Sequence, residues 1–533
     1  MILYGAPILS PPRFADVWLR RSTAVNLVAP VSQSQPKAHV AESVLAGSQP
    51  GWMTLGAERG DVRRVRLLKD SLISSRRRRL LLLSFHFPPA ETAGSLRWQK
   101  LAEHLAENGW SLDVITNDVG VVPRSGQCAL DDLPKSTRVF AVPEGQAFAR
   151  KYSRSLSRTL KGLRLPSSNS SSAPHGATAG DAARAGSLHH TEIGWRPFSE
   201  SVRRAYGAVF RLNLERGWAR AAEHCASYLL TESDPEYRAI VSCGPPHLAH
   251  FAGMKLHRRT GIPFIIDMRD PWGFVERLPE AIASPVWMKL SRFLEERCIL
   301  EAALVIANTE PAAEQLRNRY PGLGPFVSIR NGSDIIRSPA RPADGPFKVA
   351  FAGSIYLDRD PRPLFVAASR LVSEHELDPA EFRLVLVGNV SEFSGVSVRT
   401  LAESAGIGDH VDLLYPVPRD ELEGILGSAS VLVSLPQDSD LAIPSKIYEY
   451  AEYPSWLLAI SEADSATGRL LANTAADLVP PGSAEAIFDA LDARYRQYLM
   501  GLRPRALAED VRFQRSIQAE RLVELLGKFA ETR

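Results

Sequence analysis

Short apolar runs alternate with stretches of helical hydrophobic spacing along most of the chain. The first unit has an apolar run at 80–85, a helical pattern that begins at about 94 and stops at Gly109, and a second apolar run at 110–116. A strand, a helix and a second strand in this order form the crossover unit of a parallel sheet. The pattern therefore predicts an α/β nucleotide-binding half.

The alternation continues and restarts after Asn331-Gly332, a dipeptide typical of a turn and here a marker of the boundary between halves. We expect two doubly wound, Rossmann-like halves, in which ligands bind beyond the carboxyl ends of the strands. The further strands are predicted at 239–244, 263–270, 303–309, 347–354, 382–389, 411–417 and 430–436, with helices at 247–260, 291–301, 361–376 and from 444 onward.

Composition divides the chain further. Residues 1–75 mix Pro, Ser, Gly and Arg without a sustained period, and residues 166–190 are small and polar, so neither segment is expected to bury enough apolar surface to fold. The predicted organisation is a poorly ordered extension at 1–75, an N-terminal Rossmann-like domain at 76–335 with a flexible insertion at about 140–200, a C-terminal Rossmann-like domain at 336–505, and a C-terminal helix at 506–533 that packs back on the N-terminal domain.

Charge and cysteine content exclude several classes of protein. The chain of 533 residues has 63 Lys and Arg against 60 Asp and Glu, a net charge of +3 that lacks the basic excess of a nucleic-acid binder. Its four cysteines form no CxxC pair, which argues against a zinc site or a disulfide framework. No apolar run approaches the ~18 residues of a membrane span. We expect a cytoplasmic protein.

The loop after the first strand is a candidate phosphate site. Gly94, Ser95 and Arg97 stand where a Gly-containing loop meets the start of a helix. Free backbone N–H groups and the helix dipole favour an anion there. The alternative interpretation is a glycine required only for a tight turn, followed by an exposed arginine.

A second candidate follows the apolar strand at 263–268. Asp267, Arg269 and Asp270 cluster there and are followed by Pro271-Trp272. Charges at the end of a buried strand are costly unless they are paired or used in chemistry. The alternative interpretation is an ion pair that pins the loop.

The C-terminal half offers a third group. Gly353 and Ser354 end a strand, Arg359 follows, and Lys446 and Glu449 lie three apart on one helix face. Cations neutralise phosphate charge, and a carboxylate accepts hydrogen bonds from sugar hydroxyls. An ordinary surface pair of Lys and Glu is the alternative interpretation.

Together these motifs carry a resemblance to a known family. The chain resembles the retaining nucleotide-sugar glycosyltransferases of family four, which have the two-Rossmann GT-B fold. The motifs that carry this resemblance occur in the order FPP, GSxR, GPPH, GIPFIIDMRDPW, RNGSD, AGSIY and PSKIYEYAEY. The nearest relatives in pattern build bacterial surface polysaccharide. The resemblance runs from about residue 80 to the C-terminus, with an interruption at 140–200.

The resemblance implies roles for individual residues. It places Asp267, Arg269 and Asp270 on the loop that faces the cleft from the acceptor side, as the candidate catalytic residues. It makes Glu449 the partner of the nucleotide ribose. The implied donor-binding residues are Gly94, Ser95, Arg97, Gly353, Ser354, Arg359, Lys446 and Glu449.

One departure concerns the donor pocket. Many family members have a glutamate eight positions before the residue equivalent to Glu449, and this chain has Leu441 there, with Asp440 one step off. The identity of the donor sugar is therefore open.

The resemblance also implies a mechanism and partners. A sugar would pass from a nucleotide diphosphate to a lipid-linked or glycan acceptor with retention of configuration, and the chain's own cations would replace a metal ion. The basic stretches at 63–79 and 150–164 would attract an anionic membrane surface, or be merely solvated. No nucleic acid is expected. Two alternatives remain: a sugar-nucleotide epimerase or hydrolase of the same architecture, and a degenerate protein that binds nucleotide sugars without catalysis.

Overall fold

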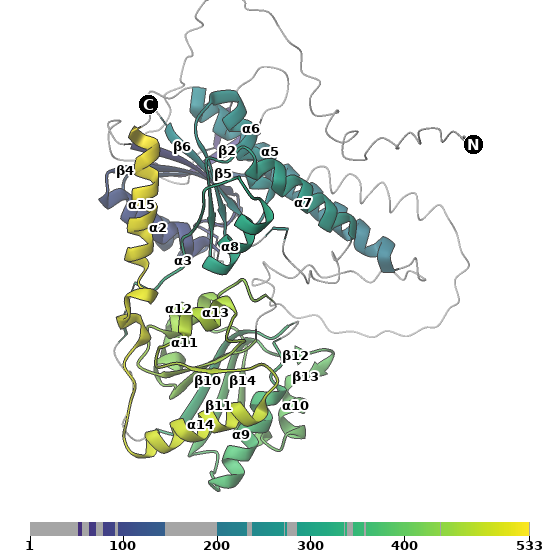
Figure 1. Cartoon of the computed structure of the whole chain (residues 1–533), viewed down its shortest axis with the longest axis vertical. Coiled ribbons are helices and arrows are strands. Elements are labelled where there is room, and N and C mark those ends of the chain that lie inside the picture. Colours follow the sequence, from purple (N-terminus) through teal and green to yellow (C-terminus); the bar gives the residue numbers. More distant parts are fainter. Residues whose placement is uncertain are drawn as a thin grey trace, which may run out of the picture.

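The computed structural model contains two sheet-based units (Figure 1). The insertion predicted at about 140–200 and the basic stretch at 150–164 lie outside the described residues, apart from the end of a strand at 140–143. The structure describes residues 52–55, 63–70, 78–90, 94–143, 200–231, 237–270, 272–273, 285–334, 336–337, 345–356, 359–436 and 439–531.

The N-terminal unit is built on a nine-stranded sheet. Its strand order is β1-β2-β5-β4-β3-β6-β7-β8-β9, and the seven strands from β3 to β9 are parallel to their neighbours, whereas β1 and β2 are antiparallel. The strands are β1 (Trp52–Leu55), β2 (Arg63–Lys69), β3 (Arg78–Ser84), β4 (Trp110–Asn117), β5 (Thr137–Val142), β6 (Tyr237–Gly244), β7 (Phe264–Met268), β8 (Leu304–Ala307) and β9 (Phe326–Ser328), and the helices are α2 (Ser95–Glu107), α3 (Arg124–Asp131), α5 (Glu200–Thr231), α6 (Leu248–Thr260), α7 (Pro285–Ile299) and α8 (Glu310–Arg319).

The C-terminal unit is built on a six-stranded parallel sheet with the order β14-β11-β10-β15-β16-β17. A small hairpin, β12 (Glu392–Phe393) and β13 (Val396–Ser397), stands apart from it. The strands are β10 (Phe347–Ser354), β11 (Phe382–Asn389), β14 (Val411–Leu414), β15 (Val431–Ser434), β16 (Trp456–Ile460) and β17 (Asp477–Val479), and the helices are α9 (Arg362–Glu374), α10 (Val398–Ser404), α11 (Arg419–Gly427), α12 (Ser445–Tyr450), α13 (Ala466–Leu471) and α14 (Ala484–Leu499). Helix α15 (Arg515–Glu531) follows in the chain and belongs by its packing to the N-terminal unit.

Both sheets reverse their strand order at one point. Numbered within its own unit, the C-terminal sheet runs 3-2-1-4-5-6, and the parallel part of the N-terminal sheet runs 3-2-1-4-5-6-7. In such doubly wound sheets the ligand crevice lies outside the carboxyl ends of the strands, where the order reverses. The expected sites are therefore the loops after β3 and β6 in one unit and after β10 and β15 in the other. The predicted fold class is confirmed.

Strands β1 and β2, at one edge of the first sheet, correct the expectation that residues 1–75 form a poorly ordered extension. Strand β2 pairs with β5, and β1 pairs with β2, although both lie inside the segment 1–75 that was expected to be a poorly ordered extension. The prediction was wrong for these strands, because their short sequences alternate little in hydrophobicity and their place in the sheet depends on pairing with β5, about 70 residues further along the chain. Val65 is nevertheless buried in the core.

Several basic residues of the predicted membrane-facing stretch are used inside the fold. Arg79 is buried and binds the Asp113 carboxylate at 3.0 Å, and Arg66 donates to the Gly120 carbonyl at 2.6 Å. Lys69 donates to the Leu130 carbonyl at 2.9 Å. These three cations therefore hold β2 and β3 in place, and the structure corrects their assignment to a membrane surface.

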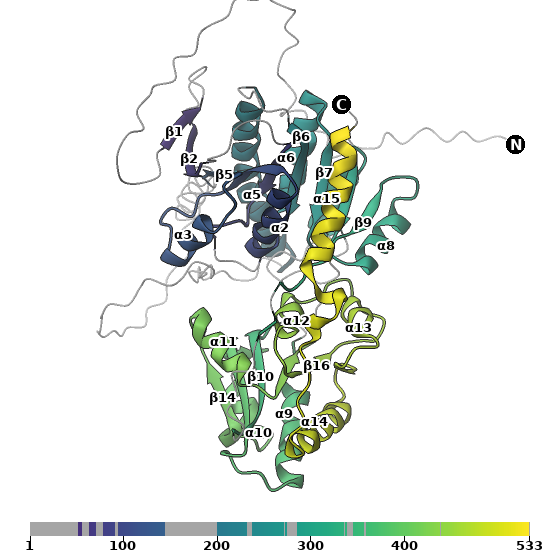
Figure 2. The ribbon, with the colours of Figure 1, turned by 90° about the vertical axis from the view of Figure 1, so that its left-hand side faces the viewer.

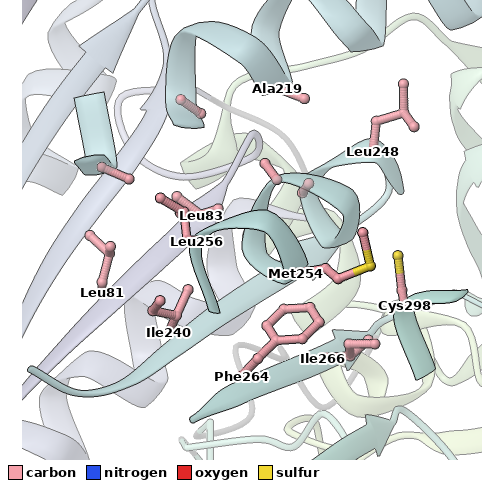
Figure 3. Close-up of a cluster of buried hydrophobic side chains, with 14 of the residues drawn as sticks. Leu81, Leu83, Ala219, Ile240, Leu248, Met254, Leu256, Phe264, Ile266 and Cys298 are labelled. Atoms are coloured by element: carbon pink, nitrogen blue, oxygen red, sulfur yellow. The ribbon is translucent and has the colours of Figure 1, made fainter. Parts of the chain in front are cut away.

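Each sheet is covered by helices on both faces. The largest core cluster of the N-terminal unit packs α5, α6 and α7 against one face, where Phe264 and Ile266 of β7 meet Met254 of α6 and Cys298 of α7 (Figure 3). On the other face α15 lies beside α2 (Figure 2), and Ala519, Leu522 and Leu526 join that core. The last helix of the chain thus packs on the N-terminal unit after the chain has completed the C-terminal sheet.

The segment between the units is held by the start of α15. Ser333 pairs with Gln514 in an isolated parallel bridge, and the Arg515 guanidinium binds the Asp334 carboxylate at 2.9 Å. A Cβ on Gly332 would lie 2.6 Å from the Arg515 Cα, so only glycine permits this approach. The turn predicted at Asn331-Gly332 is therefore a close crossing of two backbones.

Candidate functional site

A fully buried ion pair lies under the carboxyl ends of the N-terminal strands. Arg97 of α2 and Asp267 of β7 form two hydrogen bonds of 3.0 Å, from Nε to Oδ2 and from Nη2 to Oδ1, and Trp98 Nε1 donates to Oδ2 at 2.6 Å. Arg97 also donates to the Asn331 Oδ1 at 3.1 Å and to the Ile329 carbonyl at 2.8 Å. These contacts join α2, β7 and the segment after β9.

This geometry corrects two expected roles. Asp267 was a candidate catalytic residue, but it has no exposed surface and its oxygens are engaged by Arg97 and Trp98. Arg97 was a candidate donor ligand, but it is also buried and it is turned into the protein. A side chain at the last positions of a strand points to either face of the sheet, which the sequence did not reveal. The pair positions the site and does not line it.

Arg269 is the cation that faces the helix start. A Cβ added to Gly94 would lie only 1.8 Å from Arg269 Nη1, so the guanidinium lies directly against the backbone at the N-terminus of α2, beside the buried Ser95. Nη1 is buried and has no hydrogen-bond partner among the residues that the structure describes. Asp270 contacts Arg269 Nη2 at 3.5 Å and is half exposed. Arg269, Gly94 and Ser95 thus form a cationic corner at the N-terminus of α2, where the helix dipole also favours an anion.

A histidine cluster adjoins this corner, and it was missed as a site by the sequence analysis. His250 is buried, with Nδ1 2.8 Å from the Ser242 Oγ and Nε2 3.4 Å from the His247 Nδ1. His247 stacks on Trp272 with ring centroids 5.0 Å apart. The spacing of His247 and His250, three apart at the start of a helix, was the available signal.

Burial keeps the imidazole rings of His250 and His86 neutral. Burial lowers the pKa of His250 to about 4, and burial together with the nearby Arg269 lowers the pKa of His86 to about 4. At neutral pH neither ring carries a charge, so the positive charge of this corner comes from Arg269. The histidines supply hydrogen-bonding and stacking surfaces.

In the C-terminal unit the strand ends approach each other closely. Gly353 and Ser354 end β10 and pair with Gly388 and Asn389, which end β11. Asn389 Nδ2 donates to the Ser354 Oγ at 3.2 Å. Tyr450 of α12 accepts a hydrogen bond from the Ala352 N–H at 2.8 Å, which ties the helix to the end of β10. The backbone at Gly353 and Ser354 is thereby held in one place.

Gly388 should tolerate no side chain. Its φ is +120°, and a Cβ there would lie 2.2 Å from the Gly353 carbonyl oxygen. We expect Gly388→Ala to lower the free energy of unfolding by about 1–3 kcal/mol, because the strained backbone and the clash cannot both relax. Urea unfolding measures it, with Gly395→Ala as the control, since Gly395 also has positive φ (+81°) but open space around it. Equal losses in the two variants would show that the close approach is unimportant.

The cations of the C-terminal unit gather around Glu449. Lys446 Nζ binds Oε2 and Arg419 Nη1 binds Oε1, each at 2.5 Å. Arg359 stacks over the Tyr356 ring at 4.5 Å and donates to the Ser354 carbonyl at 3.2 Å. Lys446 and Glu449 are thus in contact, and Arg359 contacts the end of β10 at Ser354, whereas Arg419 was not anticipated. That these residues together hold the donor stays a prediction.

The two units meet beside this group. A small pocket is bordered by Arg269 and Asn308 from the N-terminal unit and by Leu441 from the C-terminal unit, and its other lining residues are Met268, Ala307, Ala312 and Leu316. Thr309 Oγ1 donates to the Leu441 carbonyl at 2.5 Å, and Arg469 binds Glu314 at 3.0 Å. In Figure 1, α12 and α13 lie on the side of the lower unit that faces the upper one. Leu441 thus docks against the N-terminal unit.

Comparison with known proteins agrees with this architecture. Residues 92–332 match the family described as glycosyl transferase 4-like domain. The matched segment contains α2, the buried Arg97–Asp267 pair, the histidine cluster and Arg269. The loops that build this cationic corner are therefore part of the segment that is similar to this family.

Curated relatives are similar over part of their length. The chain is 26% identical over 235 residues to a D-inositol 3-phosphate glycosyltransferase of Nocardiopsis dassonvillei, covering 40% of this chain and 54% of the relative. It is 28% identical over 193 residues to the protein of that name from Pseudarthrobacter chlorophenolicus, covering 34% and 45%. The chain spans about half the length of the curated relatives it matches.

Solved structures share the fold over most of the chain. Sucrose-phosphate synthase from Thermosynechococcus elongatus superposes with a TM-score of 0.55 at 16% identity, covering 86% of this chain and 100% of that one. Anabaena HepE in complex with UDP and glucose gives 0.50 at 13% identity, covering 85% and 100%. The fold is that of the GT-B glycosyltransferases. None of the described helices combines the length and apolar character that a bilayer crossing requires.

Proposed function

We propose that the chain is a retaining glycosyltransferase that transfers a sugar from a nucleotide diphosphate sugar to a lipid-linked or polysaccharide acceptor in cell-surface polysaccharide assembly. The observation that carries the proposal is the placement of Arg269, Arg359 and Lys446 at the carboxyl ends of two Rossmann-like sheets, one of which lies in the segment similar to the glycosyl transferase 4-like family. The HepE structure holds UDP and glucose, which supports a uridine donor.

The geometry suggests how the donor is held. Lys446 and Arg359 neutralise the diphosphate, and the backbone at Gly353 and Ser354 donates to its oxygens. Glu449 accepts hydrogen bonds from the ribose hydroxyls. These groups are preorganised, because Tyr450 and the β10–β11 ladder fix the backbone that bears them. The leaving diphosphate thus meets positive charge beside a backbone that is already fixed.

The N-terminal unit supplies the acceptor side. Arg269 and the N-terminus of α2 offer positive potential at the donor's reacting end, and Asp270 is exposed toward solvent for contact with acceptor hydroxyls. His247 and its stacked partner Trp272 provide a flat surface of the kind that packs against a sugar ring. The chain's own cations are sufficient for the charge on the diphosphate, so we expect transfer to persist after treatment with EDTA.

Binding and transfer assays test the proposal. UDP, GDP and ADP are first screened by thermal shift, where a ligand at 100 times its Kd stabilises the folded state by about 2.7 kcal/mol and raises Tm by several degrees. Radiolabelled nucleotide sugars of the base that binds are then incubated with extracted membrane lipids. Transfer of label into lipid, with the anomeric configuration of the donor, is the expected result.

Other outcomes would replace the proposal. Conversion of the nucleotide sugar without acceptor would identify an epimerase or hydrolase. Nucleotide binding without turnover, by a protein with wild-type folding, would identify a non-catalytic binder. If no nucleoside diphosphate shifts Tm, the donor site is wrongly assigned.

A further inference from the structure

Glu449 is fully engaged in the structure. One carboxylate oxygen binds Lys446 and the other binds Arg419, both at 2.5 Å, and the side chain is only 13% exposed. An ionised carboxylate has two oxygens with about four lone-pair sites, and each oxygen of Glu449 already accepts one charge-assisted hydrogen bond. A ribose diol that binds Glu449 therefore competes with Lys446 and Arg419 for the same two oxygens.

Lys446 and Arg419 differ in the partner that each side chain has after it releases Glu449. Lys446 is on the same helix as Glu449, and the proposed function gives its ammonium a new partner in the diphosphate. Arg419 comes from another element, at the first position of α11, and its side chain is 58% exposed. Only the Arg419 side of the pair is exposed, since the Glu449 side chain is 13% exposed, so opening the pair has a modest cost, about 1 kcal/mol, at the upper end of the range for surface pairs.

Arg419 has a second carboxylate that keeps it nearby. Arg419 Nε donates to the Glu423 Oε1 at 2.8 Å, one turn along α11. Glu423 is itself anchored, because Arg337 Nη1 binds its Oε2 at 2.8 Å while Arg337 Nε binds Glu452 at 3.0 Å. When Arg419 releases Glu449, it remains tethered to a fixed carboxylate.

We propose that Arg419 is a latch on Glu449, closed in the empty protein and released when a nucleoside diphosphate binds. The proposal rests on the proposed function, because it takes Glu449 as the ribose-binding carboxylate. Arg419 is then a positioning residue that sets donor affinity without touching the donor. It holds the Glu449 carboxylate in one orientation in the empty site, and the donor displaces it.

Nucleotide affinity of Arg419→Gln tests the latch. Glutamine preserves a polar side chain but removes the charge that competes for Glu449. We expect Arg419→Gln to bind the nucleotide that wild type prefers, among UDP, GDP and ADP, about two- to fivefold more tightly by calorimetry, which is the opening cost of the exposed pair. The gain should shrink at 1 M NaCl, where the pair is screened in wild type as well.

Two further variants keep the test specific. Arg370→Gln is the matched control, because Arg370 is another exposed arginine of the C-terminal unit that bridges two carboxylates, Glu374 at 2.6 Å and Glu485 at 2.7 Å. It should leave nucleotide affinity unchanged. In the Glu449→Gln background the effect of Arg419→Gln should disappear, since no carboxylate remains to be released.

Three outcomes would overturn the latch. Weaker binding by Arg419→Gln would make Arg419 a direct ligand of the nucleotide. An affinity equal to that of wild type and of Arg370→Gln would show that the pair does not compete with the donor. Absence of nucleotide binding by wild type would remove the proposed function and the latch together, whereas the first two outcomes leave the proposed function intact.

Discussion

Replacing Asp267 with alanine is expected to lower the free energy of unfolding by about 3–5 kcal/mol, because it leaves the buried Arg97 guanidinium without a counter-charge. Two hydrogen bonds of 3.0 Å and the bond from Trp98 Nε1 are lost at once. Arg97 has no exposed surface through which water could replace them. The urea midpoint, followed by circular dichroism, measures the loss.

Asp270→Ala is the matched control for this prediction. Asp270 lies three residues further along, is half exposed and contacts Arg269 only at 3.5 Å. Its removal should change stability by no more than about 0.5 kcal/mol. The two variants distinguish a structural role from a role in the reaction, because Asp267 is assigned to stabilising the fold and Asp270 to contact with the acceptor. An Asp267→Ala protein of wild-type stability that has lost transfer activity would restore Asp267 as a catalytic residue.

Replacing Lys446 with alanine is expected to lower kcat by about 10²–10³-fold. Lys446 is the cation assigned to the charge that develops on the leaving diphosphate, and loss of one such preorganised group has a cost of this size. Stability should change little, because the Lys446–Glu449 pair lies on a partly exposed helix face. Initial rates at saturating donor, with circular dichroism to verify folding, measure the effect.

The chain contains a close control for Lys446. Lys100 binds Glu103 at 3.0 Å with the same i,i+3 spacing, and the two lysine side chains have similar exposure, 29% and 31%. The Lys100→Ala protein should transfer sugar at the wild-type rate. Equal rates for Lys446→Ala and Lys100→Ala would mean that Lys446–Glu449 is an ordinary surface pair, which is the alternative that the sequence left open.

Much of the architecture was predictable because it depends on local pattern. Apolar runs of four to eight residues bounded by Gly and Pro marked the parallel strands, and the helical spacing between them implied crossovers. The position of Gly353 and Ser354 at the end of a parallel strand and the contact of Lys446 with Glu449 were also predictable, the first from strand pattern and the second from i,i+3 spacing. These inferences need only sequence order and the geometry of the fold.

Other features depended on contacts between distant residues. Strands β1 and β2 join the sheet because β5 offers a free edge, which no local pattern in the first 75 residues announces. Arg419 reaches Glu449 across 30 positions, and its partner Glu423 is held by Arg337 from the segment between the units. Sequence spacing carries no information about such pairings.

The charged loop after β7 shows most clearly which features the sequence determines and which depend on the tertiary structure. The sequence by itself determined that Asp267, Arg269 and Asp270 stand together at the end of a buried strand, where charge must be paired or used. Only the tertiary structure decided which of these charged residues is paired in the core and which lies at the site. Asp267 turns inward to Arg97, brought by α2 from 170 positions away, while Arg269 and Asp270 stay at the site. A strand places successive side chains on opposite faces of the sheet. Which residues those side chains contact depends on the elements that pack on each face.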